Sequence, residues 1–160
     1  MSKPIDRQVA PDAAHSAIEP QPAPFVHRIR VRWGDCDPAA IAYTPRIPAW
    51  ALEAIEAWWE HQAAIDWYRI NIDRDIGTPF VHMSLDFRSP VTPRHILECE
   101  VVLTRLGSRS VTHRVYGRQN GVLCFEGEFA AVFVHAKTMV PRTPPADILA
   151  AIQPAVSEDD

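Results

Sequence analysis

One long amphipathic helix is the feature that most constrains how this chain can fold. After Pro48 the sequence runs to about Trp67 without proline or glycine, and its apolar side chains recur at spacings of three or four residues. Because an α-helix has about 3.6 residues per turn, this spacing predicts a helix of about five turns with one apolar face. A single such helix must bury that face against another layer, so the rest of the chain has to supply a sheet.

Five stretches with strand patterns supply that sheet. Residues 25–33 alternate, with Ile29, Val31 and Trp33 on one face and three arginines on the other, which is the period of a half-buried strand. Four further strands are predicted at 80–87, 96–106, 111–118 and 122–135, and a short closing helix at 144–152. The Asn120-Gly121 pair indicates a tight hairpin between the last two strands. This order predicts an α+β fold in which an antiparallel sheet of about five strands wraps around a central helix.

The length of 160 residues is ordinary for one domain. Residues 1–24 hold five prolines and no apolar period, so we expect a disordered, proline-rich N-terminal arm. The folded domain is predicted at 25–153. Residues 154–160, which end in Ser-Glu-Asp-Asp, are expected to form a flexible acidic tail.

Composition and charge argue against several classes of protein. The net charge of -4 disfavours nucleic-acid binding, since phosphate contacts need a basic surface. No apolar run approaches the roughly 20 residues of a membrane span, and no leader-like segment begins the chain, so we expect a cytoplasmic protein without a membrane partner. The three cysteines and the scattered histidines lack the spacing of metal ligands, and neither a metal nor a cofactor is predicted.

The segment between the first strand and the helix holds the most unusual residues. Asp35 and Asp37 flank Cys36, and Pro38 fixes the backbone after Asp37. A carboxylate near the start of a long helix lies beside unpaired backbone N–H groups, which can hold a developing oxyanion. Such an arrangement is a minimal acyl-transfer site. The alternative, that both aspartates only cap the turn, stays open on these residues alone.

Two other hydrolytic nucleophiles are disfavoured. Neighbouring carboxylates oppose formation of a thiolate at Cys36, which is the reverse of what activation requires. The Gly-x-Ser-x-Gly motif of the α/β-type serine hydrolases is absent from the sequence.

The same segment resembles the signature of the 4-hydroxybenzoyl-CoA thioesterase family. The likeness is carried by Gly34-Asp-Cys-Asp-Pro-Ala39, followed by Ile41, Tyr43, Pro45 and Trp50, with further similarities in Gly77-Thr-Pro79, Phe87, Pro90 and Leu106-Gly107. It spans roughly Phe25 to His135. The resemblance implies the hotdog fold, whose element order agrees with the order predicted above from the residue patterns.

The resemblance also implies an activity and its residues. Asp37 matches the family's catalytic carboxylate, and the backbone N–H groups near Tyr43 and Thr44 match the group that polarises the thioester carbonyl. The implied reaction is hydrolysis of an acyl-CoA thioester to the free acid and CoA. Two departures, Ala40 in place of glycine and Thr44-Pro-Arg-Ile47 in place of aromatic-Pro-Asn-Tyr, lie beside the acyl pocket. These departures argue against a hydroxybenzoyl substrate more than against thioester hydrolysis itself.

Arg105 and Arg109, together with Arg114, surround the turn between two predicted strands. The planar guanidinium suits phosphate, so Arg105 and Arg109 are candidates for binding the phosphates of CoA; ordinary exposed charge at a turn is the alternative. A homo-oligomer is expected, with a tetramer favoured over a dimer, because one helix covers one sheet face and edge strands stay open. Trp59 and Trp67 fall off the apolar stripe and are candidates for subunit contact or substrate lining.

Two other functions remain to be weighed. A hydratase or dehydratase of acyl thioesters would keep the fold but needs a histidine working with the acid, and none is near Asp37 in sequence. A non-catalytic acyl-CoA binding module would bind the same ligand without turnover.

Overall fold

The computed structural model describes residues 24–156. All but the last residue of the predicted arm (1–24), and residues 157–160 of the predicted tail, lie outside the described residues. Ala155 and Val156, also assigned to that tail, pack against the core; Gln153–Ala155 form a short 3-10 helix and Val156 pairs with Leu103. None of the described helices is long and apolar enough to cross a membrane.

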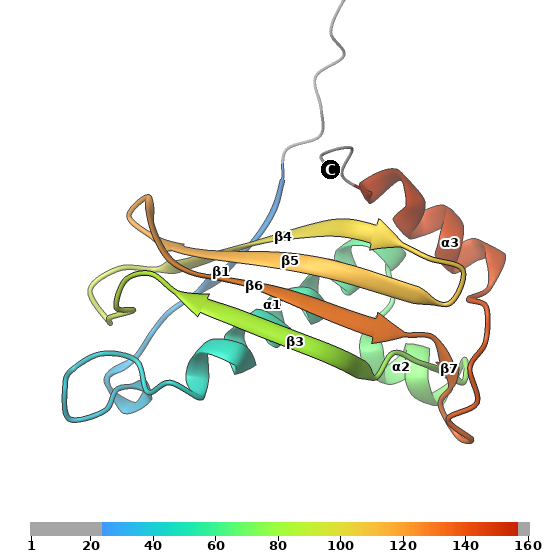
Figure 1. The fold of residues 1–160 in the computed structure, drawn as a ribbon, viewed down its shortest axis with the longest axis horizontal. Coiled ribbons are helices and arrows are strands. Elements are labelled where there is room, and N and C mark those ends of the chain that lie inside the picture. Colours follow the sequence, from blue (N-terminus) through green and yellow to red (C-terminus); the bar gives the residue numbers. More distant parts are fainter. Residues whose placement is uncertain (1–23, 157–160) are drawn as a thin grey trace, which may run out of the picture.

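Five antiparallel strands form one sheet in the order β1-β4-β5-β6-β3 (Figure 1). The strands are β1 (Phe25–Ile29), β3 (Phe80–Phe87), β4 (Leu97–Leu106), β5 (Ser110–Gln119) and β6 (Val122–Val132). β4, β5 and β6 are consecutive neighbours joined by short turns, as predicted. β3 instead lies at the edge of the sheet, beside β6. The connection from β3 to β4 therefore spans the positions that β6 and β5 occupy in the sheet.

The long helix α1 (Arg46–Ala63) lies behind the sheet in Figure 1 and contacts β1, β4 and β5. It ends earlier than the sequence pattern indicates, because Ala64 adopts the left-handed conformation with φ 53°. A second helix, α2 (Trp67–Ile72), follows, and Asp66 caps it by accepting the N–H of Arg69. The chain closes with α3 (Ala146–Ile152). The predicted α+β architecture is confirmed.

Two tryptophans lie where the residue pattern did not predict. Trp33, expected on the buried face of the first strand, is 74% exposed, because β1 ends at Ile29 and the chain turns through the 3-10 helix Trp33–Asp35. Trp59, expected off the apolar stripe, is only 2% exposed and packs edge-on against Trp58 and Phe133. The prediction that Trp59 contacts a subunit or substrate is therefore wrong, since the buried face of α1 is wider than one stripe.

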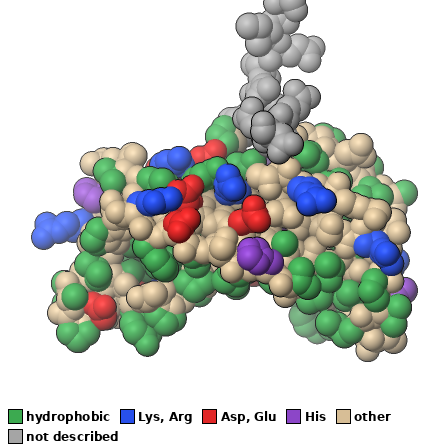
Figure 2. Space-filling view, in the orientation of Figure 1, with side chains coloured by type: hydrophobic (Ala, Val, Ile, Leu, Met, Phe, Trp, Pro, Cys, Tyr) green, Lys and Arg blue, Asp and Glu red, His purple; other side chains and the backbone are tan. Residues whose placement is uncertain are grey.

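Charged side chains of both signs cover the other face of the sheet, which faces the viewer in Figure 2. Arg118 on β5 lies 3.0 Å from Glu100 on β4, and Arg114 lies 3.7 Å from Glu128 on β6. These cross-strand pairs alternate along the strands with the buried apolar residues that face α1. One covered face and one charged face are typical of an antiparallel sheet in this kind of fold.

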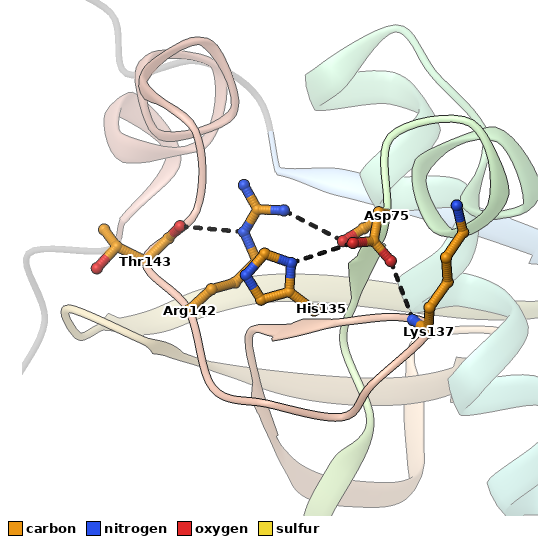
Figure 3. Close-up of polar contacts among 5 residues, drawn as sticks. All are labelled: Asp75, His135, Lys137, Arg142 and Thr143. Atoms are coloured by element: carbon orange, nitrogen blue, oxygen red, sulfur yellow. Dashed lines mark hydrogen bonds and ion pairs between the residues drawn. The ribbon is translucent and has the colours of Figure 1, made fainter.

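A second, two-stranded sheet was not predicted. It pairs β2 (Ile76–Gly77) with β7 (Val134–His135), and contacts of Asp75 with the residues around β7 stabilise it (Figure 3). The Asp75 carboxylate accepts the N–H of Lys137 and lies 3.0 Å from Nδ1 of His135, while Arg142 donates to the Asp75 carbonyl. The Lys137 hydrogen bond and the His135 contact hold the pKa of Asp75 below its usual value. Strands of two residues are too short to leave a periodic pattern in the sequence.

Candidate active site

The loop that carries Asp37 is a tight reversal between the 3-10 helix Trp33–Asp35 and α1. The Asp37 N–H donates to the Ile41 carbonyl, and the Ala40 N–H donates back to the Asp37 carbonyl, both over 3.0 Å. Cys36 and Ala42 pair across the base of the loop. The turn holds Ala40 in the left-handed region, with φ 63°. The position at which the resembling family usually has glycine is therefore one whose backbone favours glycine.

One oxygen of the Asp37 carboxylate serves the loop. Oδ1 accepts the N–H of Ala39 over 2.8 Å, which is the turn-capping role typical of aspartate. Oδ2 has no hydrogen-bond partner or cation within the described residues. The side chain is half-buried. Capping and chemistry are thus compatible here, because one oxygen fixes the side chain and leaves the other free.

Asp35 is fully engaged by its neighbours. Its Oδ2 accepts the N–H of Arg32 over 2.8 Å, its Oδ1 lies 2.8 Å from Nη2 of Arg46, and its carbonyl accepts the N–H of Tyr43 over 2.8 Å. The intervening Cys36 Sγ is directed at the Arg32 carbonyl, 3.7 Å away. Asp35 and Cys36 therefore hold the loop together, which is the structural role that the resemblance implied for them.

The start of α1 offers few free backbone donors. Pro45 and Pro48 have no N–H, and the N–H groups of Arg46 and Ile47 donate back to the carbonyls of Tyr43 and Thr44. The Tyr43 N–H is already bonded to Asp35. Within the described part of the chain, the Thr44 N–H has no acceptor. Of the two predicted oxyanion donors, the arrangement favours Thr44 and gives the Tyr43 N–H a role in closing the loop.

A pocket of about 340 Å³ opens beside this loop. Four residues of the loop and of the first turn of α1 form one wall, and the end of β3 with the start of β6 forms the other: Ile41, Ala42, Thr44, Ile47, Phe87, Arg88, Ser89, Pro90, Val91 and Cys124. A hydrogen bond from the Ala42 N–H to the Val91 carbonyl, 2.8 Å long, joins the walls. Burial raises the pKa of the Cys124 thiol, which makes it a lining group and a poor nucleophile.

Among the described residues that line this pocket, Arg88 alone is charged. Arg88 donates from both Nε and Nη2 to Glu126, over 3.0 and 2.9 Å. Its charge is thereby compensated within the chain. The lining is otherwise mostly apolar, which suits an uncharged acyl group.

Arg105 and Arg109 lie far from this pocket. Asp37 follows β1, whose last residue Ile29 pairs with Leu97 at the start of β4, whereas Arg105 and Arg109 lie at the other end of β4. β4 has ten residues, so about 30 Å of strand separates the two ends. Both arginines are exposed, and neither forms an ion pair with the described residues. Arg109 borders a hollow of about 320 Å³ with Ser108 and Ser110.

Residues 31–152 match the sequence pattern of the thioesterase-like superfamily. The chain belongs to this superfamily. A solved thioesterase-superfamily protein from Jannaschia sp. CCS1 is 49% identical, with a TM-score of 0.81, and the alignment covers 88% of this chain and 99% of that one. The five-stranded sheet with its central helix is thus the hotdog fold.

More distant solved structures share this thioesterase-like fold. A 1,4-dihydroxy-2-naphthoyl-CoA thioesterase from Synechocystis is 20% identical, with a TM-score of 0.73, over 82% of this chain and 96% of that one. A gentisyl-coenzyme A thioesterase is 22% identical, with a TM-score of 0.69, over 78% and 98%. None of the curated proteins matches the sequence.

Two features of this candidate site were not predicted from the sequence. The second wall of the pocket, from Phe87 to Val91, depends on a β3 position that only the pairing with β6 reveals. Arg46 was overlooked as well. The sequence did contain an indication of its role: a basic residue in the first turn of a helix interacts unfavourably with the helix dipole unless an acidic group lies nearby.

Proposed function

We propose that this chain hydrolyses an acyl-CoA thioester to the free acid and CoA, with Asp37 as the reacting carboxylate. The observation that carries the proposal is the loop itself. It fixes one Asp37 oxygen by the Ala39 N–H, and Thr44 lies in the wall of an apolar pocket; among residues 24–156 the other Asp37 oxygen has no partner and the Thr44 N–H has no acceptor. Membership of the thioesterase-like superfamily and the resemblance to 4-hydroxybenzoyl-CoA thioesterases support the same reaction.

Two routes use these groups. In the first, the Asp37 carboxylate attacks the thioester carbonyl, the C–S bond breaks to release CoA thiolate, and water then cleaves the mixed anhydride. In the second, Asp37 takes a proton from water as the water oxygen attacks the carbonyl, and the C–S bond then breaks to release CoA thiolate. In both, the carbonyl oxygen becomes negative and the Thr44 N–H donates to it. That contact accelerates the reaction because it strengthens as the charge develops.

The acyl group is proposed to be uncharged and of moderate size. The pocket of about 340 Å³ is near the lower end of the usual range for small-molecule sites. Arg88 is compensated by Glu126, so the described lining of the pocket has no unpaired cation to bind a substrate carboxylate. Aromatic acyl groups like those of the Synechocystis and gentisyl-coenzyme A enzymes, and medium-length aliphatic groups, both agree with this lining.

We propose a homo-oligomer, a tetramer rather than a dimer, in which two chains share each site. Arg105 and Arg109 lie at the end of the sheet opposite Asp37, so binding of the CoA phosphates by these residues requires a neighbouring chain. The edge strand β3 offers a place for that neighbour. If two copies of β3 pair antiparallel, the Asp37 end of one chain meets the opposite end of the other.

A hydrolysis screen across acyl-CoAs of different length, shape and charge tests the proposal, with the released thiol measured by a thiol-reactive dye. We expect turnover of aromatic or medium-length uncharged acyl-CoAs and little turnover of dicarboxylic ones. Tight binding of acyl-CoA without release of thiol from any substrate would instead identify a binding module. Addition or loss of water at the acyl chain with the thioester intact would identify a hydratase.

A further inference from the structure

Arg46 is an unfavourable residue for its position. It is the first residue of α1, where the helix dipole disfavours a positive charge. The first turn has no acidic residue, and Pro45 at the N-cap provides no side-chain hydrogen bond. A sequence that breaks a local rule of this kind commonly does so at a functional site.

The contact that Arg46 makes explains why a positive residue stands at the start of α1. Nη2 of Arg46 lies 2.8 Å from Oδ1 of Asp35, whose side chain is only 15% exposed. A carboxylate so withdrawn from water needs a charged or hydrogen-bonding partner, and Asp35 receives both Arg46 and the Arg32 N–H. Asp35 in turn brings negative charge to a helix start that has none of its own.

This contact ties together the two ends of the loop that carries the proposed catalytic groups. Asp37 lies two residues after Asp35, at one end of the loop. Thr44 lies between Tyr43, whose N–H donates to the Asp35 carbonyl, and Arg46, whose guanidinium meets the Asp35 carboxylate. Asp35 therefore contributes, with the hydrogen bonds inside the loop, to fixing the Asp37 carboxylate relative to the Thr44 N–H.

We propose that Arg46 is a positioning residue of the thioesterase, acting through Asp35 to hold Asp37 and the Thr44 N–H in register. The inference rests on the proposed function. Arg46 does not touch the reacting atoms; it fixes the loop against the first turn of α1. Because misplacement of a reacting group by about 1 Å can cost on the order of a hundredfold in rate, a single ion pair at this place has a large effect on turnover.

The test compares Arg46→Gln, Arg46→Lys, Asp35→Asn and the double variant Asp35→Asn/Arg46→Gln on the best acyl-CoA. Arg118→Gln is the matched control, because it removes a partly buried ion pair of 3.0 Å on the charged face of the sheet, the face opposite to α1. Melting temperatures, kcat, KM and the pH profile of kcat/KM are measured for each. All assays are run well below the lowest melting temperature, so that loss of folded protein does not enter the rates.

We expect Arg46→Gln to lower kcat by about tenfold or more, with KM changed by less than about threefold. Arg46→Lys should recover part of the loss, because lysine keeps the charge but not the planar fork. The double variant should be no slower than the slower single variant, since both changes break the same contact. Arg118→Gln should melt at about the same temperature as Arg46→Gln and keep the wild-type rate.

Three results would overturn the inference. One is a wild-type kcat for Arg46→Gln, and another is a double variant whose losses simply multiply. The third is an acid limb of the pH profile that moves while the plateau stays, because the charge of Arg46 would then act directly on a titrating group. Asp37→Asn, assayed alongside, separates this outcome from a failure of the proposed function: an active Asp37→Asn removes the thioesterase assignment of Asp37, whatever Arg46 does.

Discussion

The N–H of Tyr43 donates to the carbonyl of Asp35 over 2.8 Å, and this bond closes the loop in which Asp37 lies. It joins residues on either side of the turn and consumes a backbone donor that would otherwise be free at the start of α1. Among the described residues at the start of α1, the Thr44 N–H, one residue further along, is the backbone donor that stays available. The loop thus selects a single donor by engaging its neighbours, and the proposed mechanism depends on that selection.

The first prediction concerns Asp37→Asn. Asparagine keeps an oxygen that can accept the Ala39 N–H, so the loop should survive, but it can act neither as nucleophile nor as base. We expect kcat to fall by at least about a hundredfold with an unchanged melting temperature. Thiol release from the best acyl-CoA measures the effect. A purified Asp37→Asn protein with the wild-type rate would show that another group does the chemistry.

The second prediction concerns Ala40, whose φ of 63° is strained for a side chain with a Cβ. We expect Ala40→Gly to stabilise the protein by about 0.5–1 kcal/mol, because relief of the left-handed strain exceeds the extra entropy that glycine loses on folding. Ala39→Gly is the matched control. Its φ is not positive, so the same substitution should destabilise or do nothing. Urea denaturation of both variants measures the difference, and equal effects would contradict the strain argument.

The sequence predicted those elements that carry a local periodic pattern. The strand at 80–87 has the predicted bounds, and the long helix is displaced only at its ends, because the left-handed Ala64 that ends it leaves no mark in the residue pattern. The place of β3 at the sheet edge could not be predicted, since it depends on pairing with β6, which is distant in the chain. Burial of Trp59 depends likewise on Phe133, which comes from beyond the last long strand.

The candidate site was predicted unevenly for the same reason. Asp37 and the helix start are adjacent in sequence, so the motif and the physical argument could both identify them. The hydrogen bonds that separate Thr44 from Tyr43 as donors are geometric and leave no pattern. The role of Arg105 and Arg109 could not be predicted from one chain. They lie far from Asp37 along β4, so a site that contains all three residues requires a second chain.

The third prediction concerns stability at acid pH. His113 on β5 is 1% exposed and lies edge-on to Trp58, with ring centroids 4.6 Å apart. Neither of its ring nitrogens has a hydrogen-bond partner among the residues that the structure describes. Burial lowers the pKa of His113 from 6.5 to about 3. Between pH 6.5 and about 3, His113 is protonated in the unfolded chain but not in the folded one. The free energy of unfolding, which is highest above pH 6.5, therefore decreases as the pH falls through this range.

The expected loss is about 1.4 kcal/mol per pH unit, or about 2 kcal/mol between pH 7 and pH 5. His113→Phe keeps an aromatic ring and removes the titration, so this part of the pH dependence should vanish in the variant. Denaturant unfolding of both proteins at the two pH values gives the comparison. The same pH dependence in wild type and variant would assign the loss to other groups.

The fourth prediction concerns the CoA phosphates. If Arg109 binds them, Arg109→Ala should raise KM for acyl-CoA by about tenfold and leave KM for a short pantetheine thioester unchanged, because the latter lacks the nucleotide. Arg105→Ala should act in the same direction. Arg28→Ala is the control, since Arg28 is exposed but already lies 3.1 Å from Glu98. Equal effects of Arg109→Ala on both substrates would remove it from the nucleotide site.

The fifth prediction concerns assembly. Met83 on β3 pairs with the buried Phe129, so it lies on the sheet face that α1 covers elsewhere, yet it is 42% exposed. The main contacts of α1 are with β1, β4 and β5, so apolar side chains on β3 stay exposed and are available to a partner chain. We expect Met83→Glu to dissociate the oligomer toward an 18.0 kDa monomer and to raise KM for acyl-CoA at least as much as Arg109→Ala does, because the shared site would lose its second chain.

Val26→Glu is the control for this fifth variant. Val26 is similarly exposed, at 41%, but lies on β1 at the opposite edge of the sheet. It should leave the pairing through β3 intact, and with it the activity. Sedimentation at micromolar concentration, alongside thiol release, measures both variants. A wild-type protein that sediments as a stable, active monomer would refute the shared site outright, because one chain cannot bring Arg109 to the pocket beside the loop that carries Asp37.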